Sequence, residues 1–206
     1  MSSYLDTFSG LTETKQVSLY GFGAKLEFPD LKSISTSYCF PCSGSTKTGQ
    51  DMCKGLAQVN DTYTHALRHI EFSGPTYFSP LFKQLFSILE KTNTANLDKY
   101  MVFLVITDGI FLDMQETIDL LVSASFKPIS LLIIGVGDDH QDFEGFFHLA
   151  SLDCRDSKGN KPSRSMCRFI HYEYLNSNLA MCATTRRCFK KRYSRMCQTT
   201  SRATTR

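Results

Sequence analysis

The sequence lacks a segment that could anchor it in a membrane or direct it out of the cell. A helix needs about 20 consecutive apolar residues to cross a bilayer, whereas the apolar stretches here are short core-type runs such as 131-LLIIGVG-137. The first residues, MSSYLD, have neither the basic start nor the apolar run of a secretory signal peptide. Ser2 also excludes the N-myristoylation pattern, which needs glycine at that position. We therefore expect a cytoplasmic protein, either free or bound peripherally at the inner face of the plasma membrane.

The short signatures of common hydrolases and nucleotide-binding enzymes are also missing. The chain contains no Gly-x-Ser-x-Gly nucleophile turn and no Gly-x-x-x-x-Gly-Lys phosphate loop. His65 and His69 have the spacing of a zinc pair on a helix, but Ala66-Leu67-Arg68 stands between them, without the catalytic Glu of His-Glu-x-x-His. These absences predict a protein that is not an enzyme, with both histidines on an exposed helix face.

Cysteine-based and acidic metal motifs are incomplete. Cys39 and Cys42 form a Cys-x-x-Cys pair, but a structural zinc site needs a second ligand pair, and only Cys53 lies nearby. An acidic loop after residue 137 lacks the spacing of an EF-hand. We expect reduced cytosolic thiols and a solvated loop whose carboxylates cap a helix. The acidic residues of that loop are Asp138, Asp139, Asp142 and Glu144.

Acidic residues are absent from Asn176 to the C-terminus, a segment that we call the basic tail (176–206). All 20 acidic residues of the chain precede it. Two aromatic residues, Phe189 and Tyr193, are interleaved with its positive charges. The composition leaves three interpretations open: a disordered terminus, a segment that binds anionic lipid, or one that binds RNA. The basic residues of the tail are Arg186, Arg187, Lys190, Lys191, Arg192, Arg195, Arg202 and Arg206.

Hydrophobic periodicity predicts strands that alternate with helices. Residues 100–107 and 130–136 are continuous apolar runs of the kind that a parallel sheet buries on both faces. Apolar residues recur every three to four positions through 51–70 and again after Ser79-Pro80, which indicates helices. The alternation predicts a doubly wound, mostly parallel α/β sheet with helices on both faces. The other predicted strands are 16–22, 31–40 and 167–173, and the other predicted helices start at Asp113 and cover 142–151.

Five segments occur in the order of one known family. They are 20-YGFGAK-25, 74-GPTYFSP-80, 106-ITDGIFLDMQET-117, 130-SLLIIGVG-137 and 167-CRFIHYEYL-175. In this combination the chain resembles the copine A domain, a branch of the von Willebrand factor A-type fold. The resemblance implies a partial copine-like A domain over residues 16–175, preceded by a polar segment, 1–15, and followed by the basic tail.

The resemblance implies a metal site that is only half present. Thr76 and Asp108 match positions that supply hard oxygen ligands for Mg²⁺ or Ca²⁺. The Asp-x-Ser/Thr-x-Ser loop that completes such a site is absent, because no Asp in the chain has Ser or Thr at both the second and the fourth position after it. We therefore expect weak metal affinity at most.

The first, central strand of the A-type fold is also missing. Residues 1–15 are too polar to replace a strand that is buried on both faces. Three arrangements remain open: strands 16–22 and 100–107 pair directly, a gap separates them, or another chain supplies the missing strand. A gap leaves unpaired backbone groups, each of which costs about 1–3 kcal/mol.

Copines as a family are calcium-dependent phospholipid-binding proteins that bring partner proteins to membranes. The resemblance implies an intracellular module for protein–protein interaction, with membrane association in the family context. Two alternatives remain: a basic-tail protein that binds anionic membrane or RNA with the body as a passive scaffold, and a truncated product without independent activity. The interaction loops implied by the resemblance contain Gly74, Pro75, Tyr77, Phe78, Gly109 and Asp113.

Overall fold

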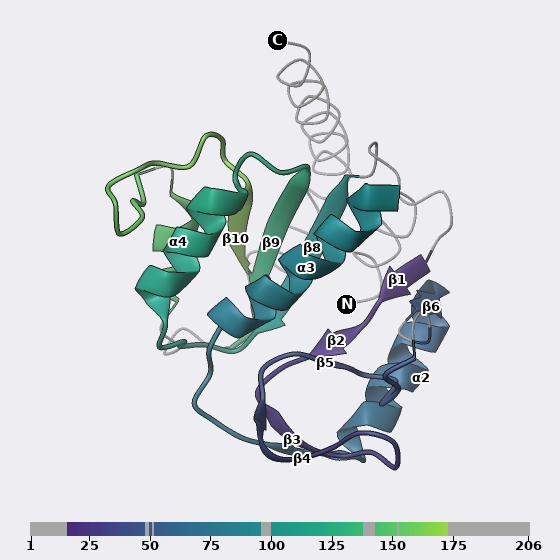
Figure 1. Cartoon of the computed structure of the whole chain (residues 1–206). Helices are drawn as coiled ribbons and strands as arrows, with labels where there is room; N and C mark the ends of the chain where they lie inside the picture. The colour runs from purple at the N-terminus through teal and green to yellow at the C-terminus, as the bar shows by residue number, and fades with distance from the viewer. Residues whose placement is uncertain are drawn as a thin grey trace, which may run out of the picture. The chain divides into compact units, whose positions relative to one another are not determined.

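The computed structural model describes residues 16–47, 50, 52–95, 100–137, 143–151 and 153–172 (Figure 1). The chain divides into two compact units, Met1–Gln84 and Leu85–Arg206. Each unit is described by itself below. Within the described residues, no helix combines the length and the apolar character needed to traverse a bilayer.

The first unit is built from short antiparallel strands and one helix. Strand β3 lies between β4 and β7 in a three-stranded sheet, while β1 pairs with β6 and β2 pairs with β5. The short connection between β3 and β4 favours their antiparallel pairing, because a parallel pair needs a crossover of about a dozen residues or more. The bounds are β1 Gln16–Ser18, β2 Tyr20–Gly21, β3 Ala24–Glu27, β4 Lys32–Ser37, β5 Phe40–Pro41, β6 Met52–Lys54, α2 Gly55–Leu67 and β7 Ile70–Phe72.

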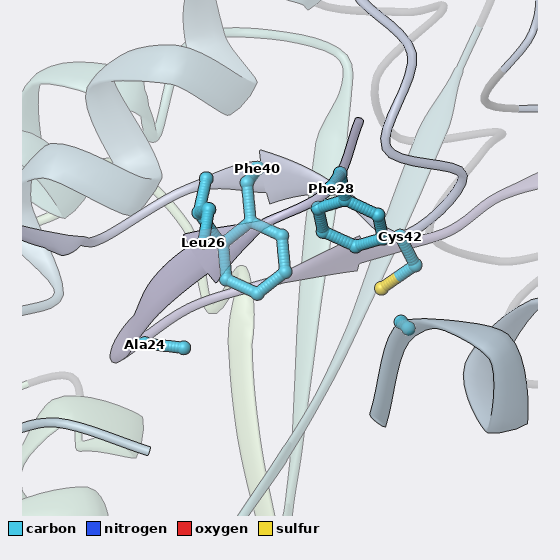
Figure 2. Packing of buried hydrophobic residues seen from close by; sticks show 6 residues of the cluster. Ala24, Leu26, Phe28, Phe40 and Cys42 are labelled. Atoms are coloured by element: carbon cyan, nitrogen blue, oxygen red, sulfur yellow. The ribbon is translucent and has the colours of Figure 1, made fainter. Parts of the chain in front are cut away.

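Six buried residues form one core cluster of this unit. The rings of Phe28 and Phe40 lie 6.5 Å apart at its centre (Figure 2). Gly44 has a φ of +69°, and a Cβ at this position would overlap the ring of Phe28. Glycine is therefore required there both by the backbone conformation and by the space that Phe28 occupies. The cluster consists of Ala24, Leu26, Phe28, Phe40, Cys42 and Ala66.

The second unit contains a parallel sheet of three strands in the order β10-β9-β8. The central strand β9 is buried at all seven positions, as its uninterrupted apolar sequence predicts. Helix α3 crosses from the first unit into the second. The bounds are α3 Ser79–Ala95, β8 Met101–Thr107, α4 Met114–Ala124, β9 Ile129–Gly135, α5 Glu144–Ala150 and β10 Cys167–His171.

Aromatic rings attach helix α5 to strand β10. Phe146 stacks on Phe169 with 5.5 Å between ring centroids and 10° between ring planes. Phe143 and Phe147 approach the same Phe169 ring at 5.4 and 4.7 Å. One strand residue thus holds three residues at the start of α5, and offset aromatic pairs of this kind add to the stability that burial provides.

The structure confirms the α/β class and the positions of most predicted elements, with three corrections. Among the described strands, parallel pairing is limited to β8, β9 and β10, since the strand pairs of the first unit are antiparallel. The predicted helix 51–70 covers only Gly55–Leu67, because residues 52–54 pair with β1 and Ile70 begins β7. The predicted strand 16–22 is divided into β1 and β2, whose different partners are β6 and β5.

In the described part of the chain, strand β8 is hydrogen-bonded on one side. Within the first unit, β1 pairs with β6 and β2 pairs with β5, and the three arrangements considered for 16–22 and 100–107 stay predictions. Among the described strands, β8 pairs with β9 alone. Strand β8 is therefore an edge of its sheet, and only Val105 and Thr107 of its seven residues are fully buried.

Candidate functional site

The loop between β8 and α4 is held by one buried aromatic residue. Phe111 is 7% exposed and contacts Phe146 of α5, with 5.0 Å between ring centroids. Because Phe111 points into the unit, its two neighbours face solvent: Ile110 is 62% exposed and Leu112 is 64% exposed. The loop thus presents two large apolar side chains from a fixed base.

A surface pocket of about 320 Å³ adjoins this loop. Gly145 makes its shape possible, because a Cβ there would lie 2.6 Å from Cε of Met114 and 3.3 Å from the ring of Phe111. Glu144 and His148, both exposed residues of α5, supply the polar part of the lining. The pocket is lined by Ile110, Phe111, Met114, Glu144, Gly145, Phe146 and His148.

Acidic residues follow the same stretch of chain. Asp108 is exposed directly after β8, and Asp113 precedes the first residue of α4. Glu116 lies in the first turn of α4, and Glu144 in the first turn of α5. The loop therefore combines apolar side chains with a negative border, which favours a partner that carries apolar and basic groups.

In the predicted interaction loop of the first unit, the aromatic side chains are covered by other residues of that unit. Phe78 is fully buried against Phe22 and Phe82, at 5.5 and 5.8 Å between ring centroids. The ring of Tyr77 meets that of Tyr38 edge-on at 5.2 Å. Both aromatic residues of this predicted interaction loop thus pack within the unit, while Gly74 and Pro75 are exposed and Thr76 is half-buried.

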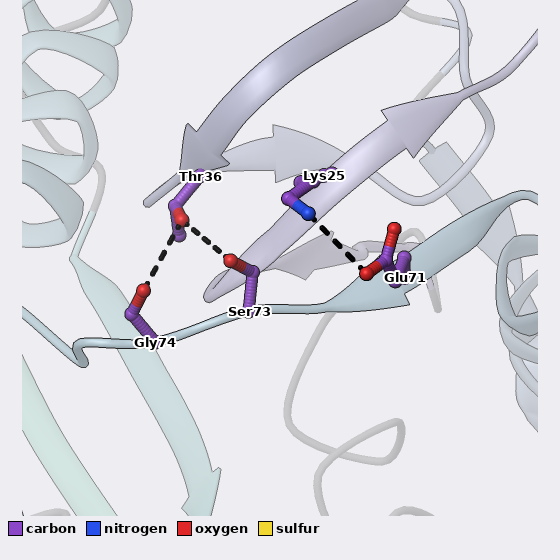
Figure 3. A network of polar contacts seen from close by, with 5 residues as sticks. All are labelled: Lys25, Thr36, Glu71, Ser73 and Gly74. Carbon is purple, nitrogen blue, oxygen red and sulfur yellow. Dashed lines mark hydrogen bonds and ion pairs between the residues drawn. The ribbon is translucent and has the colours of Figure 1, made fainter.

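Polar contacts hold the strand that leads into this loop. The hydroxyl of Thr36 is 2.8 Å from that of Ser73 and donates to the carbonyl of Gly74 at 3.4 Å (Figure 3). Lys25 pairs with Glu71 at 3.3 Å on the neighbouring strands β3 and β7. This ion pair is exposed, so it contributes at most about 1 kcal/mol.

The two predicted metal ligands lie in different units. Thr76 belongs to the first unit and Asp108 to the second. They offer two protein oxygens, whereas Mg²⁺ takes six ligands and Ca²⁺ takes six to eight. In the described part of the chain, no three His, Cys, Asp or Glu side chains are grouped so that they could hold a metal. Metal binding by Thr76 and Asp108 stays a prediction.

His65 and His69 of the first unit do not lie on the same helix. His65 lies on α2, but His69 lies beyond its end and stacks on Phe28 at 5.4 Å, so the prediction of a shared helix face was wrong for His69. Burial raises the pKa of the Cys39 and Cys42 thiols to about 12. A thiol with so high a pKa is neutral at physiological pH and is a poor nucleophile and metal ligand. The described cysteines, Cys39, Cys42, Cys53, Cys154 and Cys167, are free.

Several predicted features lie outside the described residues. These are the polar segment 1–15, the basic tail with Arg186, Arg187, Lys190, Lys191, Arg192 and Arg195, and the acidic residues Asp138, Asp139 and Asp142. The roles assigned to them stay predictions. Conversely, sequence reasoning named the Asp108–Asp113 loop but did not single out Ile110 and Leu112 in it, and it missed the pocket lining from α5. The available signal was the apolar triplet 110-IFL-112 in a predicted loop, where large apolar residues have no periodic core position to occupy.

Known proteins similar to this chain identify its family. The copine family model matches residues 1–192. Protein BONZAI 2 of Arabidopsis thaliana is 34% identical over 158 residues, which cover 76% of this chain and 26% of that protein. Copine-D of Dictyostelium discoideum is 35% identical over 159 residues, or 77% and 29% of the two chains. Nicotinic receptor-associated protein 1 of Caenorhabditis elegans is 33% identical over 181 residues, or 86% and 27%.

The chain spans about a quarter of the length of these curated relatives. Among solved structures, manganese-loaded Plasmodium vivax TRAP protein aligns with a TM-score of 0.46 and 13% identity, over 84% of this chain and 61% of that one. That likeness is too low to decide the fold. The family match, in contrast, extends over nearly the whole sequence, and the chain belongs to the copine family.

Proposed function

We propose that this chain is a protein-interaction module of the copine type, whose partner binds at the loop between β8 and α4. The observation that carries the proposal is the exposure of Ile110 and Leu112 on either side of the buried Phe111. Isolated exposed apolar residues are common on protein surfaces, but a cluster beside a pocket is typical of an interaction site. The adjoining pocket of about 320 Å³ has room for one apolar side chain of a partner.

The chemistry of the site favours a particular kind of partner segment. Ile110, Leu112 and Met114 offer apolar contact, and Asp108 and Glu144 place carboxylates beside it. A peptide with an apolar anchor next to Lys or Arg would complement both features, since opposite charges steer association and reject acidic competitors. We therefore infer a basic, apolar peptide segment as the ligand class.

Family membership supports a protein as the partner. The name of Nicotinic receptor-associated protein 1 links that relative to a receptor protein. Copines are associated with calcium-dependent membrane binding and protein interactions, and they are not known as enzymes. Because this chain corresponds to about a quarter of its relatives, their membrane binding, cytoplasmic location and partners come to it only as proposals.

The finer description of the fold belongs to the same proposal. We infer a von Willebrand A-like, doubly wound sheet with helices on both faces that lacks its first central strand. Copine membership and the parallel order β10-β9-β8 support this inference. In a sheet of this kind, ligands bind beyond the carboxyl ends of the strands, which is where the Asp108–Asp113 loop begins.

Selection of peptides from a random library displayed on phage would test the proposal. The purified chain should enrich peptides that combine an apolar anchor with Lys or Arg. The double variant Ile110→Ser/Leu112→Ser should lose affinity for the selected peptides by about tenfold or more, as expected for loss of apolar anchors. Both side chains are exposed, so the variant should retain the stability of the parent within about 0.5 kcal/mol.

Phe126→Ser is the matched control. Phe126 is 77% exposed on the turn after α4 and does not line the pocket, so its removal takes away a similar apolar surface elsewhere. The control should bind the selected peptides as the parent does. The proposal fails if no peptide class is enriched, or if the double variant and the Phe126 variant bind the peptides equally well.

A further inference from the structure

Among the described strands, β8 is hydrogen-bonded along one edge, and its other edge is open. Met101 N–H donates to the carbonyl of Pro128, and Val136 N–H donates to the carbonyl of Thr107. In a parallel pair these bonds alternate along the strand, so the odd-numbered residues of β8 face β9. The three even-numbered residues, Val102, Leu104 and Ile106, therefore direct three N–H and three C=O groups away from β9. Among the described strands none pairs with this side.

The open edge of β8 lacks the features that normally protect an edge strand. Its sequence, MVFLVIT, contains no charged residue, proline or glycine. The other edge of the same sheet, β10, carries Arg168 and His171. In the first unit, the edge strand β4 carries Lys32 and the edge strand β7 carries Glu71. Only β8 among these edges has the composition of an interior strand, and such an edge is a template for pairing with another chain.

We propose that the open edge of β8 pairs antiparallel with β8 of a second copy of this chain, which closes the two sheets into one across a two-fold axis. A second copy of β8 can complete this hydrogen-bonding pattern, and the pattern defines its register. With Leu104 opposite Leu104 of the second copy, Val102 lies opposite Ile106 of the second copy. In an antiparallel pair, two opposite residues whose N–H and C=O groups face each other exchange two hydrogen bonds. All six open backbone groups of each copy are then satisfied.

Any other register leaves part of the edge open. A shift by two residues leaves one of the three even-numbered residues without a partner. A shift by one residue places odd-numbered residues, whose groups already bond to β9, opposite the open groups. The two-fold register is therefore the one in which a single strand completes the edge, and isologous two-fold contact is the commonest way that identical chains associate.

Side chains and charges agree with the same register. Phe103 lies opposite Val105 of the second copy, an aromatic and β-branched pair of the kind that stabilises antiparallel strands. No charged residue lies within the strand, so no like charges face each other. Asp108, directly after β8, falls opposite Tyr100 of the second copy and not opposite another acidic residue. The pairing thus adds no electrostatic penalty.

Amide exchange of the full-length chain, measured residue by residue by NMR at several protein concentrations, tests the proposal. In the single chain, the amides of Phe103, Val105 and Thr107 should be protected by β9, and those of Val102, Leu104 and Ile106 should exchange fast. Across about a hundredfold increase in concentration, exchange at the three even-numbered positions should slow by at least about tenfold. The mass in solution should rise to twice that of one chain over the same range.

Two substitutions at Ile106 distinguish the contribution of its backbone N–H to pairing from that of its side chain. Ile106→Pro removes a donor that faces away from β9, and edge strands accept proline where the N–H faces outward. Ile106→Ala removes the side chain but keeps this donor. The proline variant should remain a single chain at every concentration, whereas the alanine variant should still form pairs. If the proline variant does not fold, the exchange pattern of the unchanged chain decides.

Four results would overturn the proposal. The chain could remain monomeric with fast amide exchange at Val102, Leu104 and Ile106. In that case the edge either has no partner or pairs with a different protein. Protection at these positions that does not depend on concentration would show that the chain covers its own edge. Assemblies larger than two copies would exclude a closed two-fold pair. Pairs that form with fast exchange at the even-numbered positions, or that persist in the proline variant, would place the contact elsewhere.

Discussion

Phe111 and Phe146 lie 5.0 Å apart between ring centroids, and this contact joins the loop after β8 to the helix α5. The two residues are 35 positions apart in the sequence, and both line the pocket beside Ile110. Because both rings are buried, apolar packing holds the loop. The proposed interaction site therefore depends on this pair for its shape.

Replacing Phe111 should affect both stability and binding. We expect Phe111→Ala to lower the free energy of unfolding by about 3–5 kcal/mol, the range for deletion of a buried aromatic ring. Urea denaturation followed by circular dichroism measures this change. Phe126→Ala, which removes an exposed ring, should cost less than about 0.5 kcal/mol. Equal losses in the two variants would contradict the packing described for Phe111.

Substitution of Gly145 should disturb the same pocket less than removal of the Phe111 ring, and a second substitution should relieve part of its effect. In Gly145→Ala the new Cβ would lie 2.6 Å from Cε of Met114, so the methionine side chain, which lines the pocket, must move. We expect a cost of about 1–3 kcal/mol, typical of overpacking, and weaker binding of the selected peptides. Shortening Met114 to Ala in the same chain should relieve part of the cost, and a double-mutant cycle measures the coupling. Additive effects of the two substitutions would argue against the close approach.

The buried thiol of Cys42 should make stability depend on pH in the alkaline range. Burial, followed by the neighbouring Cys53 and Cys39 thiols, raises the pKa of Cys42 to about 12, while an unfolded cysteine has a pKa of about 8.5. Between these values the unfolded chain releases the proton and the folded chain keeps it, so the free energy of unfolding should fall as pH rises. The contribution is fully present below about pH 8.5, and its slope approaches about 1.4 kcal/mol per pH unit above it.

The test is the difference between the unchanged chain and Cys42→Ala, measured by urea denaturation from neutral pH to about pH 10.5. Subtracting the two curves removes the titration of lysine and tyrosine residues elsewhere. The alanine variant should lose less stability with rising pH. Parallel curves would mean that the thiol ionises as readily in the folded chain as in the unfolded one.

Divalent metal should have little effect on stability. Thr76 and Asp108 supply two oxygens in place of the six that Mg²⁺ requires, so millimolar Mg²⁺ or Ca²⁺ should shift the melting temperature by less than about 1 °C relative to EDTA. Differential scanning fluorimetry of the unchanged chain, Thr76→Ala and Asp108→Ala provides the comparison. A rise with metal in the unchanged chain that disappears in both variants would show that the two residues do share a metal site.

Much of the second unit follows from local sequence. The apolar run that forms β9 is buried at every position, and the helix predicted to start at Asp113 begins at Met114. The first unit was harder to predict. The periodic pattern of residues 51–70 continues through Met52 and Ile70, yet these residues lie in strands, because backbone partners at Ser18 and Leu26 outweigh local helix preference.

The predicted site illustrates the same limit. Tyr77 and Phe78 belong to a recognisable motif, but Phe22, Phe82 and Tyr38 cover their rings. Ile110 and Leu112 belong to a motif as well, and they are exposed because Phe111 occupies the available space against Phe146. No pattern of neighbouring residues distinguishes these two outcomes, since each depends on a residue that is distant in the sequence.

The sequence by itself determined the family, the α/β class and the absence of the Asp-x-Ser/Thr-x-Ser loop. These are properties of residue order and of apolar periodicity, which act between neighbours in the chain. Only the tertiary structure decided the antiparallel pairing of the first unit, the pocket beside Ile110 and the open edge of β8. The physical reason is that burial and hydrogen-bond satisfaction are determined by whichever segments meet in space, and a strand such as β8 has the same sequence whether or not a partner covers its second edge.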